Sequence, residues 1–143
     1  MERAKSKYLR LSDYQFKLYN ELWVSLSDLH LKADVLWKHA NMNNLIAFSQ
    51  QLFDTGMSIS RNRLLIEESH FDQLMKILNT FHNYQVGKIS LIQLRETDPH
   101  QHINIRDIDR VILDNQENKQ KYSELLEKLV VEFRKQITGD LSP

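Results

Sequence analysis

The scarcity of residues that interrupt helices limits what this chain can fold into. Only three glycines and two prolines occur in 143 residues. A β-sandwich or a β-barrel of this length would need a turn about every 8–12 positions, and turns are rich in these two residues. We therefore predict an all-α fold.

The strongest helical pattern covers residues 8–40. Apolar side chains recur there every three or four positions, which is the period of one buried helix face. At about 1.5 Å per residue, such a helix would be roughly 50 Å long, which favours an elongated bundle over a compact globule. The apolar face consists of Leu11, Tyr14, Leu18, Leu22, Leu26, Leu29, Ala33, Leu36 and Ala40.

A second helix is expected to follow a short turn. Asn41, Asn43 and Asn44 are good turn and N-cap residues, and they precede an apolar period that begins at Leu45. Gly56 either ends this helix or lies inside it, and the sequence leaves both alternatives open.

A third helix is predicted over residues 69–95. Ser69 with Asp72 three positions later resembles a capping box, and an apolar period follows. Gly87 disfavours a helix by about 1 kcal/mol relative to Ala. A strand over residues 88–94 is therefore the alternative for the end of this segment.

The last segment follows a loop at residues 97–104, which contains Pro99 and has no apolar period. Helical periods resume after the loop, on both sides of residues 114–121. Those eight residues carry no apolar side chain. We expect one long helix whose middle is surrounded by water, and a break into two helices is the alternative.

These segments form one domain in our prediction. A basic arm at residues 1–10 precedes a single helical domain at residues 11–138, and a short tail at residues 139–143 follows. The predicted architecture is an elongated bundle of about four long, mostly antiparallel helices.

Composition excludes several functional classes. Nineteen basic residues balance nineteen acidic ones, so the chain lacks the positive field of a nucleic-acid-binding protein. The absence of cysteine excludes disulfides, thiolate zinc sites, Fe–S clusters and cysteine nucleophiles. No apolar run approaches the roughly twenty residues of a membrane span, and residues 1–11 lack the apolar core of a signal peptide. A cytoplasmic location is therefore expected.

The densest group of possible metal ligands lies in the predicted loop. In an extended chain, Asp98, His100, His102 and Asn104 would share one face, and imidazole and carboxylate ligands suit Zn, Mn or Fe. The sequence offers no further committed ligand. Our preferred interpretation is a hydrated loop in which Asp98 or Asn104 caps the next helix, with no metal or other cofactor bound.

A catalytic alternative rests on the spacing of arginine and histidine. Six residues separate Arg63 from His70, and four and six residues separate Arg95 from His100 and His102. This spacing resembles that of metal-independent RNases of the HEPN type, which are all-helical. The resemblance implies that His70 is a general base beside the RNA 2′-hydroxyl and that Arg63 holds the phosphate.

Chance also explains that spacing. Eight arginines and six histidines in 143 residues give about one such match at random. We therefore prefer the interpretation that Arg63 is a surface charge at a helix junction and that His70 is a residue of a first helical turn.

The basic arm is a possible binding element. Arg3, Lys5, Lys7 and Arg10 oppose only Glu2, which gives a local excess of three positive charges. Such an arm could contact an acidic partner, RNA or anionic lipid. A solvated tail is the simpler interpretation.

Aromatic residues of the first helix are the other candidates for binding. Trp23 and Trp37 are 14 residues apart, or two heptads, and therefore lie on the same side of the helix, with Tyr19 beside them. Aromatic side chains are common anchors of protein interfaces, although packing into the core would also explain them. We therefore predict a non-catalytic interaction module that presents a helix surface to a protein partner and self-associates, with Tyr19, Trp23 and Trp37 as anchors.

Overall fold

The computed structural model describes residues 2–96 and 105–138, with side chains described for residues 13–96 and 106–138. Within these ranges the chain is helical apart from short connections and contains no strand. The elements are α1 (Glu2–Lys38), α2 (Met42–Arg61), the short 3-10 helix η1 (Arg63–Leu65), α3 (Glu68–Glu96) and α4 (Ile105–Thr138). The predicted all-helical bundle is confirmed.

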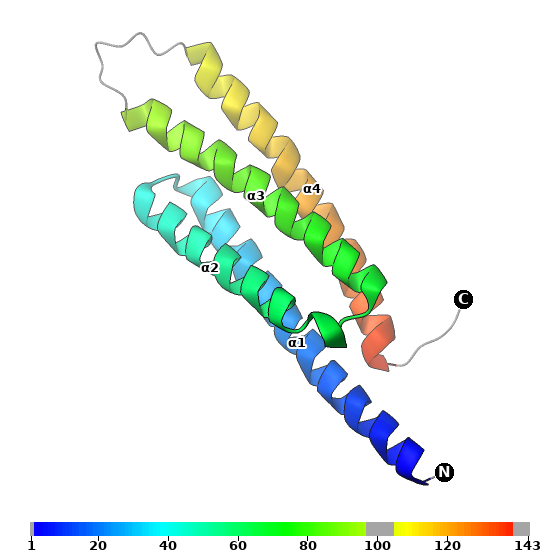
Figure 1. Ribbon diagram of the computed structural model, residues 1–143. Helices are drawn as coiled ribbons and strands as arrows, with labels where there is room; N and C mark the ends of the chain where they lie inside the picture. The colour runs from blue at the N-terminus through cyan, green and yellow to red at the C-terminus, as the bar shows by residue number, and fades with distance from the viewer. Residues whose placement is uncertain (1, 97–104, 139–143) are drawn as a thin grey trace.

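The helices lie side by side along one long axis (Figure 1). Consecutive helices run in opposite directions, and the N-terminal end of α1 extends past the other helices (Figure 1). With 37 residues, α1 is about 55 Å long. No helix in the described ranges combines the length and the apolar character that a bilayer crossing requires.

The observed ends of the helices can be compared with the caps and turns predicted from the sequence. Asn41 is the N-cap of α2 as expected, and its side chain accepts a hydrogen bond of 2.9 Å from the Asn44 backbone amide. The helix continues through Gly56 to Arg61. The capping role predicted for Ser69 is wrong, because α3 already begins at Glu68 and Ser69 lies inside its first turn.

The two remaining alternatives are also decided by the structure. Residues 88–94 belong to α3, so the strand alternative is wrong. Residues 114–121 belong to a continuous α4.

The core is formed by the apolar faces of all four helices. Its central layer is aromatic: the rings of Phe81 and Tyr122 stack with centroids 4.3 Å apart, and Phe48 and Tyr84 pack edge to face at 5.4 Å. The fully buried large side chains include Tyr19, Leu22, Leu26, Leu29, Leu36, Phe48, Ile59, Leu74, Ile77, Phe81, Tyr84 and Tyr122.

The middle of α4 is not surrounded by water, contrary to our expectation. Asn115 is only 2% exposed, and its Nδ2 donates a hydrogen bond of 3.0 Å to the Tyr84 backbone carbonyl. Nδ2 of Asn118 donates to Oδ1 of Asn115, also at 3.0 Å. Only one side of residues 114–121 is buried, and Asn115 can lie there because these hydrogen bonds satisfy its amide.

Gly87 allows this close packing of α3 against α4. A Cβ atom at Gly87 would lie 2.6 Å from Cγ of Asn115, which is too close for two carbon atoms. A Cβ atom at Gly56 would meet only Cδ1 of Leu78, at 4.0 Å. Thus Gly87 is required by tertiary packing, whereas Gly56 is an ordinary interior helix position.

We expect Gly87→Ala to lower the free energy of unfolding by about 1–3 kcal/mol, because the new methyl group displaces the buried Asn115 side chain. Gly56→Ala is the matched control and should raise it by about 0.5–1 kcal/mol through helix propensity. Urea denaturation followed by circular dichroism measures both. In an Asn115→Ala background, Gly87→Ala should no longer destabilise the protein; equal effects of the two glycine substitutions in the native background would contradict this explanation.

Candidate functional site

The widest junction between neighbouring helices contains the tyrosine–histidine contact and the lysine–tryptophan contacts described below. Of the four neighbouring pairs, α1 and α4 approach each other least. Large side chains fill the space between them, supplied by α1 and α4 and by the adjoining face of α3. We call this the α1–α4 seam, and it consists of Tyr19, Trp23, His30, Asp34, Trp37, His70, Tyr84, Lys88, Lys119, Tyr122 and Phe133.

At one end of the seam, Tyr19 joins α1 to the start of α3. The Tyr19 hydroxyl lies 2.8 Å from Nδ1 of His70 and accepts a hydrogen bond of 3.1 Å from the Glu67 backbone amide. The Tyr19 hydroxyl therefore bridges the Glu67 backbone amide and the His70 ring. Tyr19 is fully buried and His70 is 6% exposed, so this group is part of the core.

A glutamine completes the same end of the bundle. Nε2 of Gln15 donates to the Leu65 backbone carbonyl at 2.9 Å, and Oε1 of Gln15 accepts from Nε2 of Gln136 at 2.7 Å. One side chain of α1 therefore links the connection between α2 and α3 to the end of α4.

The structure places the residues of the predicted RNase pair in separate surroundings. The guanidinium of Arg63 lies 4.4 Å from the ring centroid of Phe71, and Arg63 is exposed. His70 instead contacts Tyr19 and packs edge to face on Phe133. A general base must reach its substrate, and this histidine is enclosed by the bundle.

The predicted metal ligands Asp98, His100 and His102 lie outside the described residues, so that site stays a prediction. In the part of the chain that the structure does describe, no three His, Asp or Glu side chains are grouped as a metal ion would require.

Of the predicted anchors, one lies in the core and two lie at its edge. Tyr19 is a core residue, while Trp23 and Trp37 are half-buried and pack against the core from its edge. Sequence spacing correctly grouped the two tryptophans on one side of α1, but it could not show how much of each ring remains exposed.

At the other end of the seam, two lysines flank one indole ring. The ammonium of Lys88 lies 4.2 Å from the centroid of the Trp37 ring, and that of Lys119 lies 4.8 Å from it. Lys88 is only 3% exposed, and its ammonium is also 5.8 Å from the ring of Tyr84. In the described part of the chain, no carboxylate lies within ion-pair distance of Lys88.

Burial, together with the positive charges of Arg95 and Lys119, lowers the pKa of Lys88 to about 8. Sequence analysis missed this residue. The signal was present, because Lys88 continues the buried period of Leu74, Phe81 and Tyr84, where an apolar residue is expected.

Tyr84 lies beside this lysine and packs edge to face on Tyr122, and the two hydroxyl groups differ in hydrogen bonding. Tyr84 donates to the Ala33 backbone carbonyl at 2.6 Å. The Tyr122 hydroxyl is buried and has no hydrogen-bond partner in the described part of the chain. Burial raises the pKa of both phenols, and the negative charge of Asp34 raises both further.

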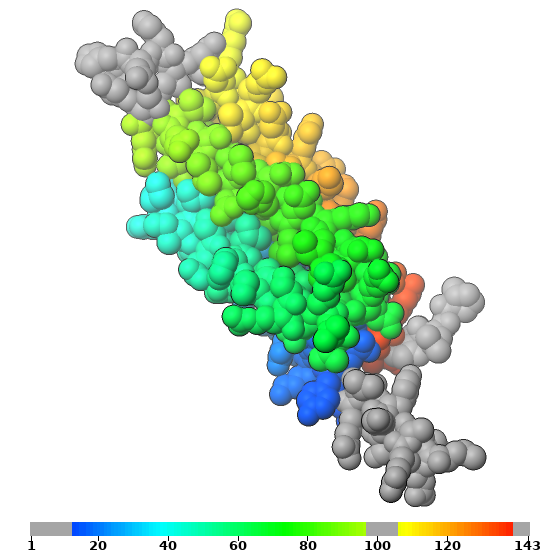
Figure 2. All heavy atoms as spheres, viewed as in Figure 1, coloured from blue at the N-terminus to red at the C-terminus, as the bar shows by residue number. Residues whose placement is uncertain are grey.

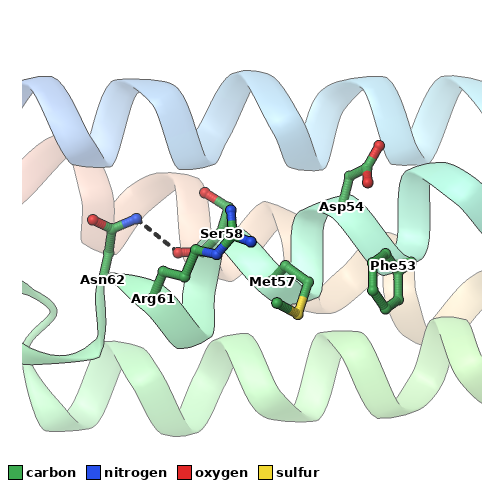
Figure 3. Close-up of a pocket in the computed structure, with 6 residues that line it drawn as sticks. All are labelled: Phe53, Asp54, Met57, Ser58, Arg61 and Asn62. Carbon is green, nitrogen blue, oxygen red and sulfur yellow. Dashed lines mark hydrogen bonds between the residues drawn. The ribbon is translucent and has the colours of Figure 1, made fainter.

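A second feature lies on the outer surface of α2, away from the seam. A shallow hollow there is lined by Phe53, Asp54, Met57, Ser58, Arg61 and Asn62 (Figure 3). Phe53 is 63% exposed, and Ile46, seven residues earlier on the same helix, is 59% exposed. Apolar side chains at this spacing form one stripe along the helix.

Comparison with known protein families, characterised proteins and solved structures finds no match to this chain. The geometry of the two surfaces is therefore the basis for assigning a function.

We expect Tyr19→Phe to lower the free energy of unfolding by about 1–3 kcal/mol, because it leaves Nδ1 of His70 and the Glu67 amide without their partner. Tyr122→Phe is the matched control: it removes a buried hydroxyl that has no partner, so stability should stay the same or rise by up to about 1 kcal/mol. Chemical denaturation monitored by fluorescence measures both. A loss of equal size in both variants would contradict the hydrogen bonding described for the seam.

The buried lysine predicts an unusual pH dependence of stability. Its folded-state pKa of about 8 is below the ordinary value of 10.5, so between these pH values the unfolded chain binds more protons and stability rises with pH. Above pH 10 the raised pKa values of Tyr84 and Tyr122 reverse the trend, because the unfolded phenols ionise first.

Urea denaturation from pH 8 to pH 10 should show a gain of roughly 1–2 kcal/mol in the wild type. The Lys88→Met variant should show no such gain over this interval. A wild-type profile that falls steadily through the interval would show that Lys88 is not held in a desolvated site.

Proposed function

We propose that this protein is a non-catalytic interaction module that binds a protein partner through the outer face of α2, and that the partner is a second copy of the same chain. The observation that carries the proposal is the exposed apolar stripe of Ile46 and Phe53, next to the hollow lined by Phe53 and Met57. The cytoplasmic location expected from the sequence is part of this proposal.

The stripe has the chemistry of a protein interface. Burying one such side chain completely contributes about 1.5–3 kcal/mol, and large aromatic side chains seated in a pocket are frequent anchors. Asp54, Ser58 and Arg61 surround Phe53 and Met57 with polar groups. An apolar centre with a polar rim is the usual arrangement of an interface.

The neighbouring helix extends this surface. Met75 and Val86 of α3 are 44% and 49% exposed, and Nε2 of Gln85 joins the two helices by donating to Oγ of Ser49 at 2.8 Å. The two helices together form the face turned towards the viewer in Figure 2. A partner helix laid on α2 would therefore find apolar contacts on α3 as well.

Charge and symmetry favour a second copy as the occupant. The formal net charge of the chain is zero at pH 7, so two copies do not repel each other at long range. A stripe along a helix can pair with its own copy about a twofold axis, because each copy then supplies the same patch.

The α1 residues predicted as anchors are not part of the proposed interface. Tyr19 is fully buried and offers no surface to a partner. The half-buried Trp23 and Trp37 lie on the seam, so their substitution tests the seam rather than the stripe.

The test compares two pairs of substitutions by light scattering coupled to size-exclusion chromatography. Ile46→Asp with Phe53→Asp should weaken self-association by more than about tenfold, because two carboxylates would enter the apolar centre. Leu31→Asp with Val24→Asp is the matched control on α1, where the side chains are 64% and 51% exposed and also seven residues apart.

We expect a dimer for the wild type and for the α1 pair of substitutions, and a monomer for the α2 pair. Circular dichroism should show the same helicity in all three proteins, because every substituted side chain is exposed. A monomeric wild type at high concentration, or a dimer that survives the α2 substitutions, would overturn the proposal.

A further inference from the structure

Lys88 is almost wholly buried, at 3% exposure, and forms no ion pair in the described ranges. Burying a cation without an acid or a full set of hydrogen bonds is costly, so buried lysines are usually paired. In the described ranges no carboxylate lies within ion-pair distance of Lys88, and its ammonium lies 4.2 Å from the ring centroid of Trp37 and 5.8 Å from that of Tyr84. Cation–π contact with these rings offsets only part of the loss of hydration.

The surroundings of this ammonium add positive charge. Lys119 on α4 approaches the same indole ring to 4.8 Å, and both Lys119 and Arg95 act on Lys88 as like charges. Asp34, an acid on α1, lies 3.8 Å from Nε2 of His30 and acts on the two tyrosines. The end of the seam at Trp37 therefore gathers positive charge, and in the part of the chain that the structure describes neither lysine forms an ion pair with a carboxylate.

We propose that Lys88 of α3 and Lys119 of α4, which both lie beside Trp37, form a binding site for the phosphate group of a small ligand. Two ammonium groups match the charge of a phosphate dianion, and charge-assisted hydrogen bonds from lysine to phosphate are strong. A bound phosphate supplies the missing counter-charge for both lysines at once.

The position of the site allows a ligand to reach it. Trp37 and Lys119 are each half-buried and therefore partly open to solvent, whereas Lys88 is 3% exposed. The site is in the junction where neighbouring helices approach least. Side chains rather than close helix packing fill this junction, so the proposed binding requires the Lys119 side chain to move aside.

This site is independent of the proposed self-association. The phosphate site uses α1, α3 and α4 at the seam, whereas self-association uses Ile46 and Phe53 of α2. Either proposal can fail without the other.

The test uses the fluorescence of Trp37. The chain contains two tryptophans, so Trp23→Phe leaves Trp37 as the only reporter of the site. Inorganic phosphate is titrated at constant ionic strength against sodium chloride, at a pH near 7.5 where Lys88 retains its proton. We expect a saturable change in Trp37 emission.

The lysine substitutions are made in the same Trp23→Phe background. Lys88→Met and Lys119→Met should each weaken phosphate binding by about tenfold or more, which corresponds to the loss of one hydrogen bond to a charged group. Lys121→Met removes an exposed lysine two residues from Lys119 on α4 and is the matched control, with unchanged affinity expected. Lys88→Met removes an unpaired buried charge, so this variant is expected to fold.

A titration with glycerol phosphate identifies the source of the phosphate group: tighter binding than inorganic phosphate indicates a phosphate ester, and equal binding indicates free phosphate. The proposal is overturned if Trp37 emission shows no saturable change, or if Lys88→Met and Lys119→Met bind phosphate as tightly as Lys121→Met. The second result would mean that phosphate acts only as a stabilising salt.

Discussion

Burial of the apolar face of α1 is the constraint on which the rest of the structure depends. From Leu18 to Leu36 this face is almost completely enclosed, and no single neighbouring helix is wide enough to cover it. The other helices must therefore lie along α1 for most of its length. An elongated bundle with short connections satisfies that requirement, and the hydrogen bonds of the backbone are satisfied within each helix.

The helices are unequally spaced, and this spacing determines which polar and charged side chains lie in the interior. Gly87 lets α3 lie close to α4, and the buried amide of Asn115 pairs there with the α3 backbone and with the half-buried Asn118. On the opposite side of α4 the approach of α1 is wide, and aromatic rings fill the space. Those rings accommodate Lys88, a charge that an evenly packed apolar core would exclude.

The two proposed surfaces follow from different physical properties. The stripe on α2 exposes apolar area that is removed from water only when another molecule covers it, so it favours a large partner with a helical surface. The lysines at Trp37 instead present charge in a small, partly enclosed space, which favours a compact anion. Since α2 supplies none of the residues at Trp37, an interface on the stripe would leave the seam open.

The sequence by itself determined the fold class, the approximate extent of the helices and the N-cap at Asn41, because these depend on local preferences and on the spacing of apolar residues along one helix. It also grouped Trp23 with Trp37 correctly. Only the tertiary structure decided that Gly87 is required and that Asn115 is buried. It likewise decided that Tyr19 belongs to the core, that Phe53 is exposed and that Lys88 and Lys119 meet at one ring. Each of these depends on which residues of another helix lie opposite, and the period of a single helix carries no information about its neighbours.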